Sequence, residues 1–440
     1  MTTISPLVIT GIMFGAMILL MATGLPLTFT LGAVAMGTAI LLWGPAAMQG
    51  VYLNAVGLGQ IGTLVALPLF IFMGLVLQKS GIADTLYKAI HIIMGSVNGG
   101  LAMGTVAICA VIAAMAGVSG AATISMGLIA LPAMLKRKYD KQMITGCVQA
   151  GGALGFLIPP SVEMIMFGFL ATISVGKLYA AGVLPGLMLA TLYIIYIGIR
   201  CFFQPNLGPA LPLEERVGWV GKIKALRYLI LPGLLIVMVL GFIFLGISSI
   251  TEASAVGALG ALICAIIYRR FTLRMLHESL IETAKVMGMV MWIGLSALFF
   301  SSIYIGLGAP SMINHLVTEL AVSPYVILVA ILASFFIMGM FLDDYAIMFI
   351  TIPIYVPLIV TLGFDKVWFG TLFILSMQSA YLTPPFGYNL FYMKAVAPPE
   401  ITLADIYRSV IPFVGLQILG IIIVVIFPQI ALWFPKIIFG

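Results

Sequence analysis

Apolar segments of membrane-spanning length follow one another along almost the whole chain, and this pattern limits its possible folds more than any other feature. A helix needs about 20 apolar residues to cross a hydrocarbon core about 30 Å thick. The full-length candidates are 7–23, 25–43, 62–78, 143–171, 178–202, 228–245, 253–268, 286–305, 368–392 and 410–432. Only 8% of the 440 residues are charged, whereas soluble domains carry roughly a quarter. The sequence therefore predicts an all-α polytopic membrane protein.

Two further apolar stretches, 101–135 and 325–360, are interrupted near their middle. The first contains the sequence Gly-Val-Ser-Gly at 117–120, and the second contains Asp343-Asp344. At 1.5 Å per residue, each half of such a stretch covers only about 25 Å. Each stretch is therefore either two short spans or a re-entrant hairpin whose tip lies inside the membrane.

The sequence contains an internal repeat at an offset of 225 residues, the separation of Pro159 from Pro384. At this offset Pro159-Pro160 falls on Pro384-Pro385, and Asp140-Lys141 falls on Asp365-Lys366. We predict a first repeat over 1–202 and a second over 228–440. Each contains one hairpin (101–135, 325–360) and one proline-broken helix (143–171, 368–392). The segment 203–227 is predicted to join the repeats as an amphipathic cytoplasmic arm.

The charges indicate how the repeats are oriented. A basic loop is formed by Lys136, Arg137, Lys138 and Lys141. Short loops rich in Lys and Arg usually lie in the cytoplasm, so we expect this loop there. The matching loop at 361–366 has only the balanced pair Asp365 and Lys366. With hairpins, each repeat crosses the membrane an odd number of times, so the second repeat is inverted. Both termini are then predicted to be periplasmic, and the basic clusters anchor loops rather than bind nucleic acid.

Four breaks in the apolar helices are the candidate binding elements: 117–123, 151–161, 339–344 and 383–389. A break in a membrane helix frees backbone groups, which must be satisfied by protein, water or a ligand. Carbonyls at a half-helix C-terminus suit a small cation such as Na⁺, and N–H groups at an N-terminus suit an anion. Paired breaks and inverted repeats are typical of secondary transporters.

Three carboxyl groups are predicted to lie at membrane depth, where charge is costly and usually functional. Asp343 and Asp344 lie at the second hairpin tip, although one of them could simply cap a helix. Glu163 follows the first Pro-Pro break, and it could be a coupling-ion site, a proton carrier or a helix-start residue. The alternatives to a transporter are an intramembrane enzyme using Asp343 and Asp344, or an ion channel. The chain lacks a phosphate-binding glycine loop with Lys, which disfavours an ATP-driven pump.

Several segments resemble the large membrane subunit of TRAP transporters, the DctM-type or M subunit. They are LPLFIFMG (67–74), GVSGAATISMG (117–127), GGALGFLIPPS (151–161), TEASAVGA (251–258), GMFLDDYAIMFITIPIYVP (339–357) and TPPFGYNLF (383–391). The resemblance implies a Na⁺-driven importer of organic acids in the bacterial inner membrane, and therefore not an enzyme. It implies a scaffold with a mobile transport domain that moves as an elevator. The implied partners are a small four-helix membrane subunit (Q-type) and a periplasmic substrate-binding protein (P-type).

The resemblance also implies particular site residues. Carried onto this chain, the sodium ligands are Ser119, Gly120, Thr123 and Pro159 in the first repeat, and Asp343, Thr383, Pro384 and Gly387 in the second. The substrate is expected between the hairpins, near Ser161, Glu163, Asp344 and Asn389. The family usually has an uncharged residue where this chain has Glu163. This difference indicates a site that holds a further cation or binds a substrate hydroxyl, and it weakens the case for a strictly dianionic substrate.

Overall fold

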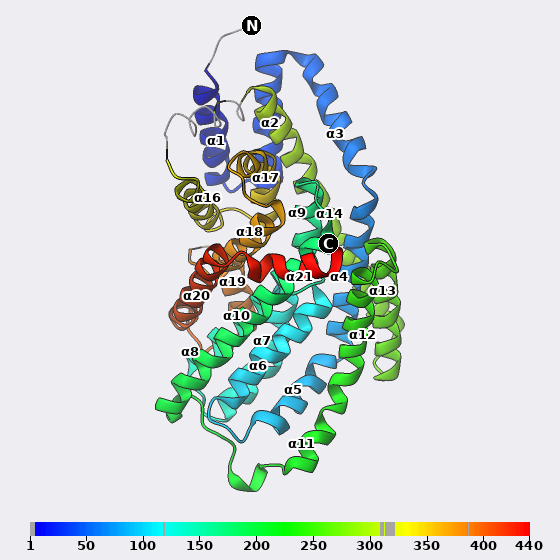
Figure 1. The fold of residues 1–440 in the computed structure, drawn as a ribbon, viewed down its shortest axis with the longest axis vertical. Coiled ribbons are helices and arrows are strands. Elements are labelled where there is room, and N and C mark those ends of the chain that lie inside the picture. Colours follow the sequence, from blue (N-terminus) through cyan, green and yellow to red (C-terminus); the bar gives the residue numbers. More distant parts are fainter. Residues whose placement is uncertain (1–4, 118, 309–311, 313–321, 386) are drawn as a thin grey trace.

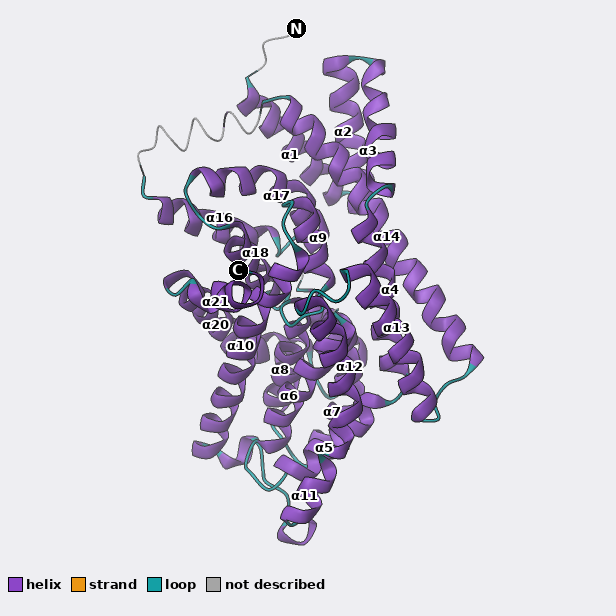
Figure 2. Ribbon diagram, turned by 45° about the vertical axis from the view of Figure 1, so that its right-hand side comes forward, coloured by secondary structure: helices purple, strands orange, loops and turns teal. Residues whose placement is uncertain are grey.

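The computed structural model describes residues 5–117, 119–308, 312, 322–385 and 387–440. These residues form helices and loops without any strand (Figure 2). The helices are spread along one long axis (Figure 1). At one end lie α1 (Pro6–Ala22), α2 (Leu27–Trp43) and α3 (Gln49–Gly59), and α11 (Trp219–Ala225) lies at the other. The prediction of an all-α fold is confirmed.

Most other helices coincide with the apolar segments of the sequence. Their bounds are α4 (Ala66–Lys79), α5 (Ile82–Met94), α6 (Gly100–Ala116), α7 (Ser119–Lys136), α8 (Lys141–Ala153), α9 (Val162–Leu170), α10 (Val175–Phe203), α12 (Arg227–Phe244), α13 (Ile250–Ile267), α14 (Leu273–Gly306), α16 (Pro324–Met338), α17 (Asp344–Thr361), α18 (Lys366–Ala380), α19 (Tyr388–Val396), α20 (Leu403–Ile426) and α21 (Gln429–Phe439). Short 3₁₀ turns connect some of them: η1 (Pro45–Met48), η2 (Gly62–Val65), η3 (Leu154–Phe156), η4 (Pro205–Leu207) and η5 (Leu213–Glu215).

Seven helices of the described chain are long and apolar enough to cross a membrane. They are Ser119–Lys136, Val175–Phe203, Trp219–Phe244, Ile250–Ile267, Leu273–Gly306, Asp344–Thr361 and Leu403–Ile426. The pair α4 and α5 also passes the same test, with a bend of 60° at its break. The chain is therefore a multi-pass helical membrane protein, as predicted.

Both interrupted stretches form two helices joined by a short connection. In the first, α6 and α7 meet at Gly117, which has a left-handed φ of +63°; residue 118 lies outside the described residues. In the second, α16 ends at Met338 and α17 begins at Asp344. The interruptions lie where Gly117 and the Asp343-Asp344 pair predicted them.

Both proline-broken helices are also present. The break between α8 and α9 contains Pro159-Pro160, and the break between α18 and α19 contains Pro384-Pro385. Proline has no backbone N–H to donate within a helix, so two in a row end the hydrogen-bond ladder. Asp140 and Asp365 precede α8 and α18, and each side chain accepts two backbone N–H bonds of the first turn. The repeated Asp-Lys pair thus marks the start of each broken helix.

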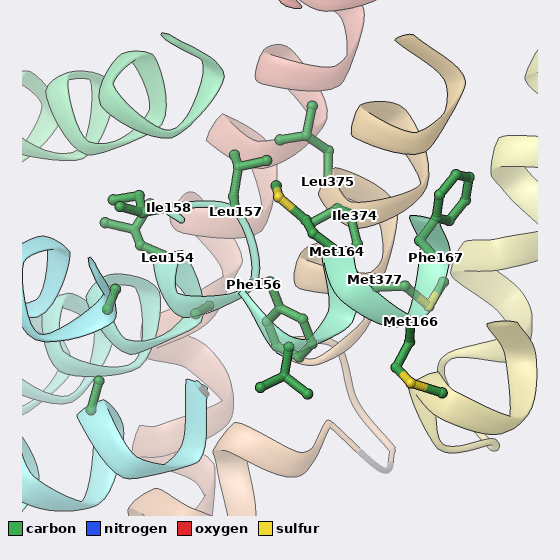
Figure 3. Close-up of a cluster of buried hydrophobic side chains, with 14 of the residues drawn as sticks. Leu154, Phe156, Leu157, Ile158, Met164, Met166, Phe167, Ile374, Leu375 and Met377 are labelled. Carbon is green, nitrogen blue, oxygen red and sulfur yellow. The ribbon is translucent and has the colours of Figure 1, made fainter. Parts of the chain in front are cut away.

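Apolar packing holds the first break in place (Figure 3). Phe167 of α9 packs against Phe373 of α18, with ring centroids 5.3 Å apart. The buried side chains drawn around the break are Leu154, Phe156, Leu157, Ile158, Met164, Met166, Phe167, Ile374, Leu375 and Met377. Because α18 itself leads into the second break, this cluster fixes one break relative to the other.

Several helices differ from the apolar segmentation. α3 and α5 lie outside every predicted span, and α14 begins at Leu273, well before the predicted 286. The first turns of α14 carry charged residues such as Arg274 and Glu278, which form an i,i+4 ion pair at 2.8 Å. Such a pair stabilises a helix, but a search for apolar segments does not detect it. The predicted span 410–432 is wrong in its bounds, because Pro428 follows the end of α20 and α21 starts a new helix.

The segment 203–227 contains η4, η5 and α11. Trp219 of α11 is 81% exposed, and the Lys222 ammonium lies 5.5 Å from the centre of its ring. Arg137, just past α7, pairs with Glu215, and this pairing holds the pKa of the Glu215 carboxyl below its ordinary value. The segment is thereby tied to the basic loop after the first hairpin.

Candidate functional site

The tip of the first hairpin packs directly on the first helix break. The backbone N–H of Val162 donates to the carbonyl of Gly117 across 3.3 Å. A Cβ atom on Gly117 would lie 2.6 Å from the carbonyl oxygen of Pro160. Contact with a backbone atom cannot be relieved by a side-chain movement, so the close approach and the positive φ both require glycine here.

Asn389, in the first turn of α19, joins three helices through its buried side chain. Its Oδ1 accepts hydrogen bonds from Ser119 Oγ at 3.0 Å and Thr123 Oγ1 at 3.3 Å. Its Nδ2 donates to the carbonyl of Gln149 at 3.3 Å. Asn389 is 0% exposed. The result is a buried cluster of hydroxyl, amide and carbonyl oxygens, the ligand type that Na⁺ uses at broken membrane helices.

Small residues allow the helices to approach at this cluster. A Cβ atom on Gly152 of α8 would lie 2.0 Å from Thr123 Oγ1 and 3.0 Å from the Thr123 backbone nitrogen. A Cβ atom on Gly120 would lie 2.7 Å from the ring of Tyr392 in α19. The predicted sodium residue Gly120 therefore lies where α7 meets α19.

A second cluster surrounds Ser161, the N-cap of α9. Its Oγ lies 2.6 Å from the carbonyl oxygen of Phe156 and 3.0 Å from Glu163 Oε2, and it accepts a bond from the Met164 N–H at 3.4 Å. The Tyr179 hydroxyl donates to the Ser161 carbonyl at 3.3 Å. Glu163 is 3% exposed. Ser161 and Glu163 therefore contact each other at the start of α9.

The adjacent aspartates at the second hairpin have different surroundings. Asp343 is the N-cap of α17, and its Oδ1 accepts the Tyr345 N–H at 3.0 Å. The helix-capping role considered for one of the pair thus belongs to Asp343. Asp344 is 2% exposed, and its Oδ1 accepts the Tyr381 hydroxyl at 3.2 Å. Its Oδ2 has no hydrogen-bond partner among the described atoms.

The second break contains Thr383, Pro384 and Gly387; residue 386 lies outside the described residues. Thr383 Oγ1 donates to the Ser379 carbonyl at 2.8 Å, and the Gly387 N–H donates to the Thr383 carbonyl at 3.1 Å. A Cβ atom on Gly387 would lie 2.7 Å from the Tyr381 carbonyl oxygen. Glycine is therefore needed for the chain to fold back this closely.

Tyr381 links the two breaks. Its ring contacts the edge of Phe156 at a centroid distance of 4.5 Å and stacks on Tyr388 at 5.1 Å. Phe156 belongs to the first break, and Tyr388 begins the helix after the second. The hydroxyl of Tyr381 reaches Asp344, so one side chain contacts both breaks and the second hairpin.

The carboxyl groups of the site have no basic partner among the described residues. The ion pairs there join Lys79 to Glu278 and Glu282, Arg137 to Glu215, and Arg274 to Glu278. Glu163, Asp343 and Asp344 act on one another electrostatically. An ionised carboxylate buried without a partner costs several kcal/mol. The buried carboxyl groups of Glu163 and Asp344 therefore require a bound cation or a proton.

The structure groups the predicted residues partly in a different way. Asn389, predicted for substrate, contacts Ser119 and Thr123, which were predicted for sodium. Pro159 is buried within the first break, and Pro384 is half-buried within the second. The predicted residues thus lie at the breaks and hairpin tips, and Asn389 connects the first hairpin to the second broken helix.

Sequence reasoning missed Gln149 and Tyr381. Gln149 is an amide in the middle of an otherwise apolar and small-residue stretch of α8, a signal that could have identified it. Its Nε2 donates to Ser409 Oγ at 3.2 Å, and its backbone carbonyl accepts the hydrogen bond from Asn389 Nδ2. Tyr381 had no such signal, since its role depends on a contact with Asp344 across the fold.

Buried oxygens and carboxyl groups at paired helix breaks, inside a multi-pass helical protein, define a membrane transporter. Residues 14–430 match the family "Tripartite ATP-independent periplasmic transporter, DctM component". The chain belongs to this family. The resemblance to TRAP large subunits is thereby confirmed.

Known relatives agree with this assignment. The chain is 32% identical over 399 residues to the C4-dicarboxylate TRAP transporter large permease protein DctM of Pseudomonas aeruginosa, covering 90% of this chain and 92% of the relative. It is 29% identical to the ectoine/5-hydroxyectoine TRAP transporter large permease protein UehC of Ruegeria pomeroyi, over 97% and 99% of the two chains. These relatives are permeases, so the chain is a transporter subunit and not an enzyme.

A solved structure shares the fold. The YdaH transporter of Alcanivorax borkumensis superposes with a TM-score of 0.64 at 15% identity, covering 92% of this chain and 96% of that one. At this identity the likeness concerns the fold alone.

Proposed function

We propose that this subunit carries out Na⁺-coupled import of an organic acid anion that a periplasmic substrate-binding protein delivers. The observation that carries the proposal is the Asn389 cluster, in which side chains from the first hairpin and the second broken helix share buried oxygens. Carboxyl groups that have no basic partner among the described residues lie at the first break and the second hairpin tip. Both features call for small cations in the site.

Two sets of residues are proposed as sodium sites, with no bond geometry implied. The first is Ser119, Gly120, Thr123 and Pro159, and the second is Asp343, Thr383, Pro384 and Gly387. The contact of Ser119 and Thr123 with Asn389 supports adding the Asn389 side chain to the first set. A cation there would pull the first hairpin onto the second broken helix.

The substrate is proposed to lie between the hairpin tips, near Ser161, Glu163, Asp344 and Asn389. The N-terminus of α9 at Ser161 carries the partial positive charge of a helix start, which favours an anion nearby. C4-dicarboxylates, 2-oxo acids, sialic acids and sulfonates are the classes to test, and the ectoine relative adds zwitterions.

An inverted repeat organises this proposed machinery, with re-entrant hairpins and broken helices in the moving part of an elevator. Helix bounds support the repeat: α17 begins and ends 225 residues after α7, and α18 begins 225 residues after α8, the same offset as Pro159 to Pro384. The remaining helices would form the scaffold, and the first-repeat loop would be cytoplasmic with both termini periplasmic.

The proposed assembly includes a small four-helix membrane subunit and the binding protein, in the bacterial inner membrane. The family description names a tripartite periplasmic transporter, which supports two further components. The exposed apolar residues Leu41 of α2 and Leu53 of α3 belong to the surface that lipid or another membrane subunit would cover.

Reconstitution with both partners tests the proposal. Uptake of radiolabelled members of the four anion classes is measured with an inward Na⁺ gradient, with an equal K⁺ gradient, and without the binding protein. We expect uptake of at least one class only with Na⁺ and the binding protein together. Uptake that is unchanged in K⁺ would contradict the sodium coupling.

A further inference from the structure

We propose that Glu163 is a proton-binding site of the transport core and holds a proton in the conformation described here. The inference rests on the proposed function, since it concerns the same site. It assigns to the Glu163 carboxyl a role distinct from sodium binding.

The hydrogen count around Ser161 carries the inference. Its hydroxyl has one hydrogen, yet its Oγ lies within hydrogen-bond distance of two oxygens, Phe156 O at 2.6 Å and Glu163 Oε2 at 3.0 Å. The peptide carbonyl of Phe156 can only accept, and it is the nearer of the two. The Ser161 hydrogen therefore goes to Phe156, and the contact with Glu163 needs a hydrogen from the other side. A protonated Glu163 carboxyl supplies it by donating to Ser161 Oγ.

The surroundings of Glu163 favour the neutral form. The titratable groups that interact with it are Asp343, Asp344 and Tyr345 on α17 and Tyr179 on α10. The bases on the helices packed against α9 lie near helix ends: Lys79 on α4, Lys177 and Arg200 on α10, and Lys366 on α18. Lys79 is already paired with Glu278 and Glu282. Asp343 and Asp344 are two acidic neighbours of Glu163, and no base among the described residues pairs with it. A third negative charge on Glu163 is therefore unfavourable.

The position of Glu163 in the first turn of α9 works in the opposite direction. A helix N-terminus stabilises a carboxylate, but this effect is small compared with the cost of burying an unpaired charge. Glu163 is 3% exposed, so burial dominates. None of its hydrogen bonds goes to a proposed sodium ligand. The proton on Glu163 and sodium at the two proposed sites therefore occupy different atoms, although Glu163 and Asp343 interact electrostatically.

A neutral Glu163 also removes a conflict in the proposed site. A carboxylate beside the N-terminus of α9 would repel an organic anion. The protonated acid would not, and the partial positive charge of the helix N-terminus would then favour the anion.

Infrared spectroscopy of the purified full-length chain tests the inference without a substrate. Near neutral pH, we expect the wild-type spectrum to contain the C=O band of a protonated carboxyl that the E163Q spectrum lacks. Glutamine keeps the volume and the donor to Ser161, so the fold should persist. The control Glu214→Gln removes an exposed carboxyl of the linker and should leave the band unchanged. Equal bands in wild type and E163Q would overturn the inference.

A Ser161→Ala variant gives a second test that depends on a sign. If Ser161 accepts a hydrogen from the protonated acid, its removal should shift the midpoint of the Glu163 band to lower pH, by about one unit or a tenfold loss of proton affinity. A shift to higher pH would mean that Ser161 donates to a carboxylate, and would contradict the inference. If the E163Q variant does not fold, the pH titration of the Ser161→Ala variant tests the inference by itself.

The same samples separate this inference from the proposed function. Thermal stabilisation by NaCl relative to KCl reports sodium binding, whatever the state of Glu163. If NaCl stabilises the chain but the carboxyl band is absent, the proton site fails and sodium coupling stands. If the carboxyl band is present but NaCl does not stabilise the chain, the proton site stands and sodium coupling fails.

Discussion

At the scale of single residues, the site depends on a few side chains that connect elements far apart in the sequence. Asn389 accepts hydrogen bonds from two hydroxyl groups of α7 and donates one hydrogen bond to a backbone carbonyl of α8. Tyr381 plays the corresponding role for Asp344. Because the hydrogen bonds of Asn389 are buried, each loss of a partner there leaves a polar group that water cannot reach.

Asn389→Ala should therefore weaken sodium binding without unfolding the protein. The substitution orphans the hydroxyls of Ser119 and Thr123, a penalty of about 1–3 kcal/mol, so the Na⁺ concentration for half-maximal uptake should rise about tenfold. The exposed Asn206 of the linker offers a matched control, Asn206→Ala. An unchanged sodium dependence in Asn389→Ala would remove this residue from the site.

The sequence predicted which residues stand at the site better than how they combine. Ser119 and Asn389 were identifiable because they lie at helix breaks marked by Gly and Pro, and Asp343 because a charged side chain is rare at membrane depth. Their pairing was not, since the Ser119–Asn389 bond joins residues 270 apart in the chain. Gln149 carried a signal, a single amide among apolar and small residues, but its contacts with Asn389 and Ser409 join distant parts of the chain and could not be predicted.

At the scale of elements, each break is held by close backbone packing rather than by a long loop. The turn after α6 lies on the carbonyl of Pro160, and α7 lies on Gly152. The sequence predicted these breaks from their Gly and Pro residues. It could not predict α3 or the early start of α14, because the charged first turns of α14 have no apolar signal.

Gly117→Ala tests whether this packing matters for transport. Gly363 provides a matched control, since it also has a positive φ, +83°, but nothing within 4 Å of its missing Cβ. Gly363→Ala should cost only the left-handed strain, about 1–2 kcal/mol. Gly117→Ala adds the contact with Pro160 and should lower the Tm further and abolish most uptake. Equal losses of Tm and uptake in the two variants would contradict a special role for this contact.

The repeated aspartates should act as helix caps. Asp365→Ala removes an acceptor of the Val367 and Trp368 N–H groups, and Asp140→Ala removes the equivalent acceptor before α8. We expect each to lower the free energy of unfolding by about 1 kcal/mol, measured by thermal or denaturant unfolding in detergent. A change of stability near zero for both would mean that the Asp-Lys repeat has another purpose.

At the scale of the whole molecule, the described helices form a multi-pass membrane protein whose candidate site is assembled from two distant parts of the chain. The apolar segments predicted this class directly, because so few charges leave no soluble alternative. The predicted inverted orientation of the repeats rests instead on the charges of the loops, and it is tested by a separate experiment.

Thiol labelling of vesicles tests the inversion. Lys136 ends α7 and Thr361 ends α17, both are exposed, and they occupy equivalent positions of the repeat. The four native cysteines are buried, which keeps the background low. An impermeant reagent should label Lys136→Cys only from the cytoplasmic side and Thr361→Cys only from the periplasmic side. Labelling of both from one side would rule out inverted repeats.

The most direct test of the account is sodium binding by the purified subunit. Because a ligand that binds only the folded state stabilises it, the Tm should be higher in NaCl than in KCl at equal ionic strength. Asp343→Ala should lose most of this difference, whereas the linker variant Glu214→Gln should retain it. A wild-type Tm that is the same in both salts would contradict the claim that these helix breaks bind sodium.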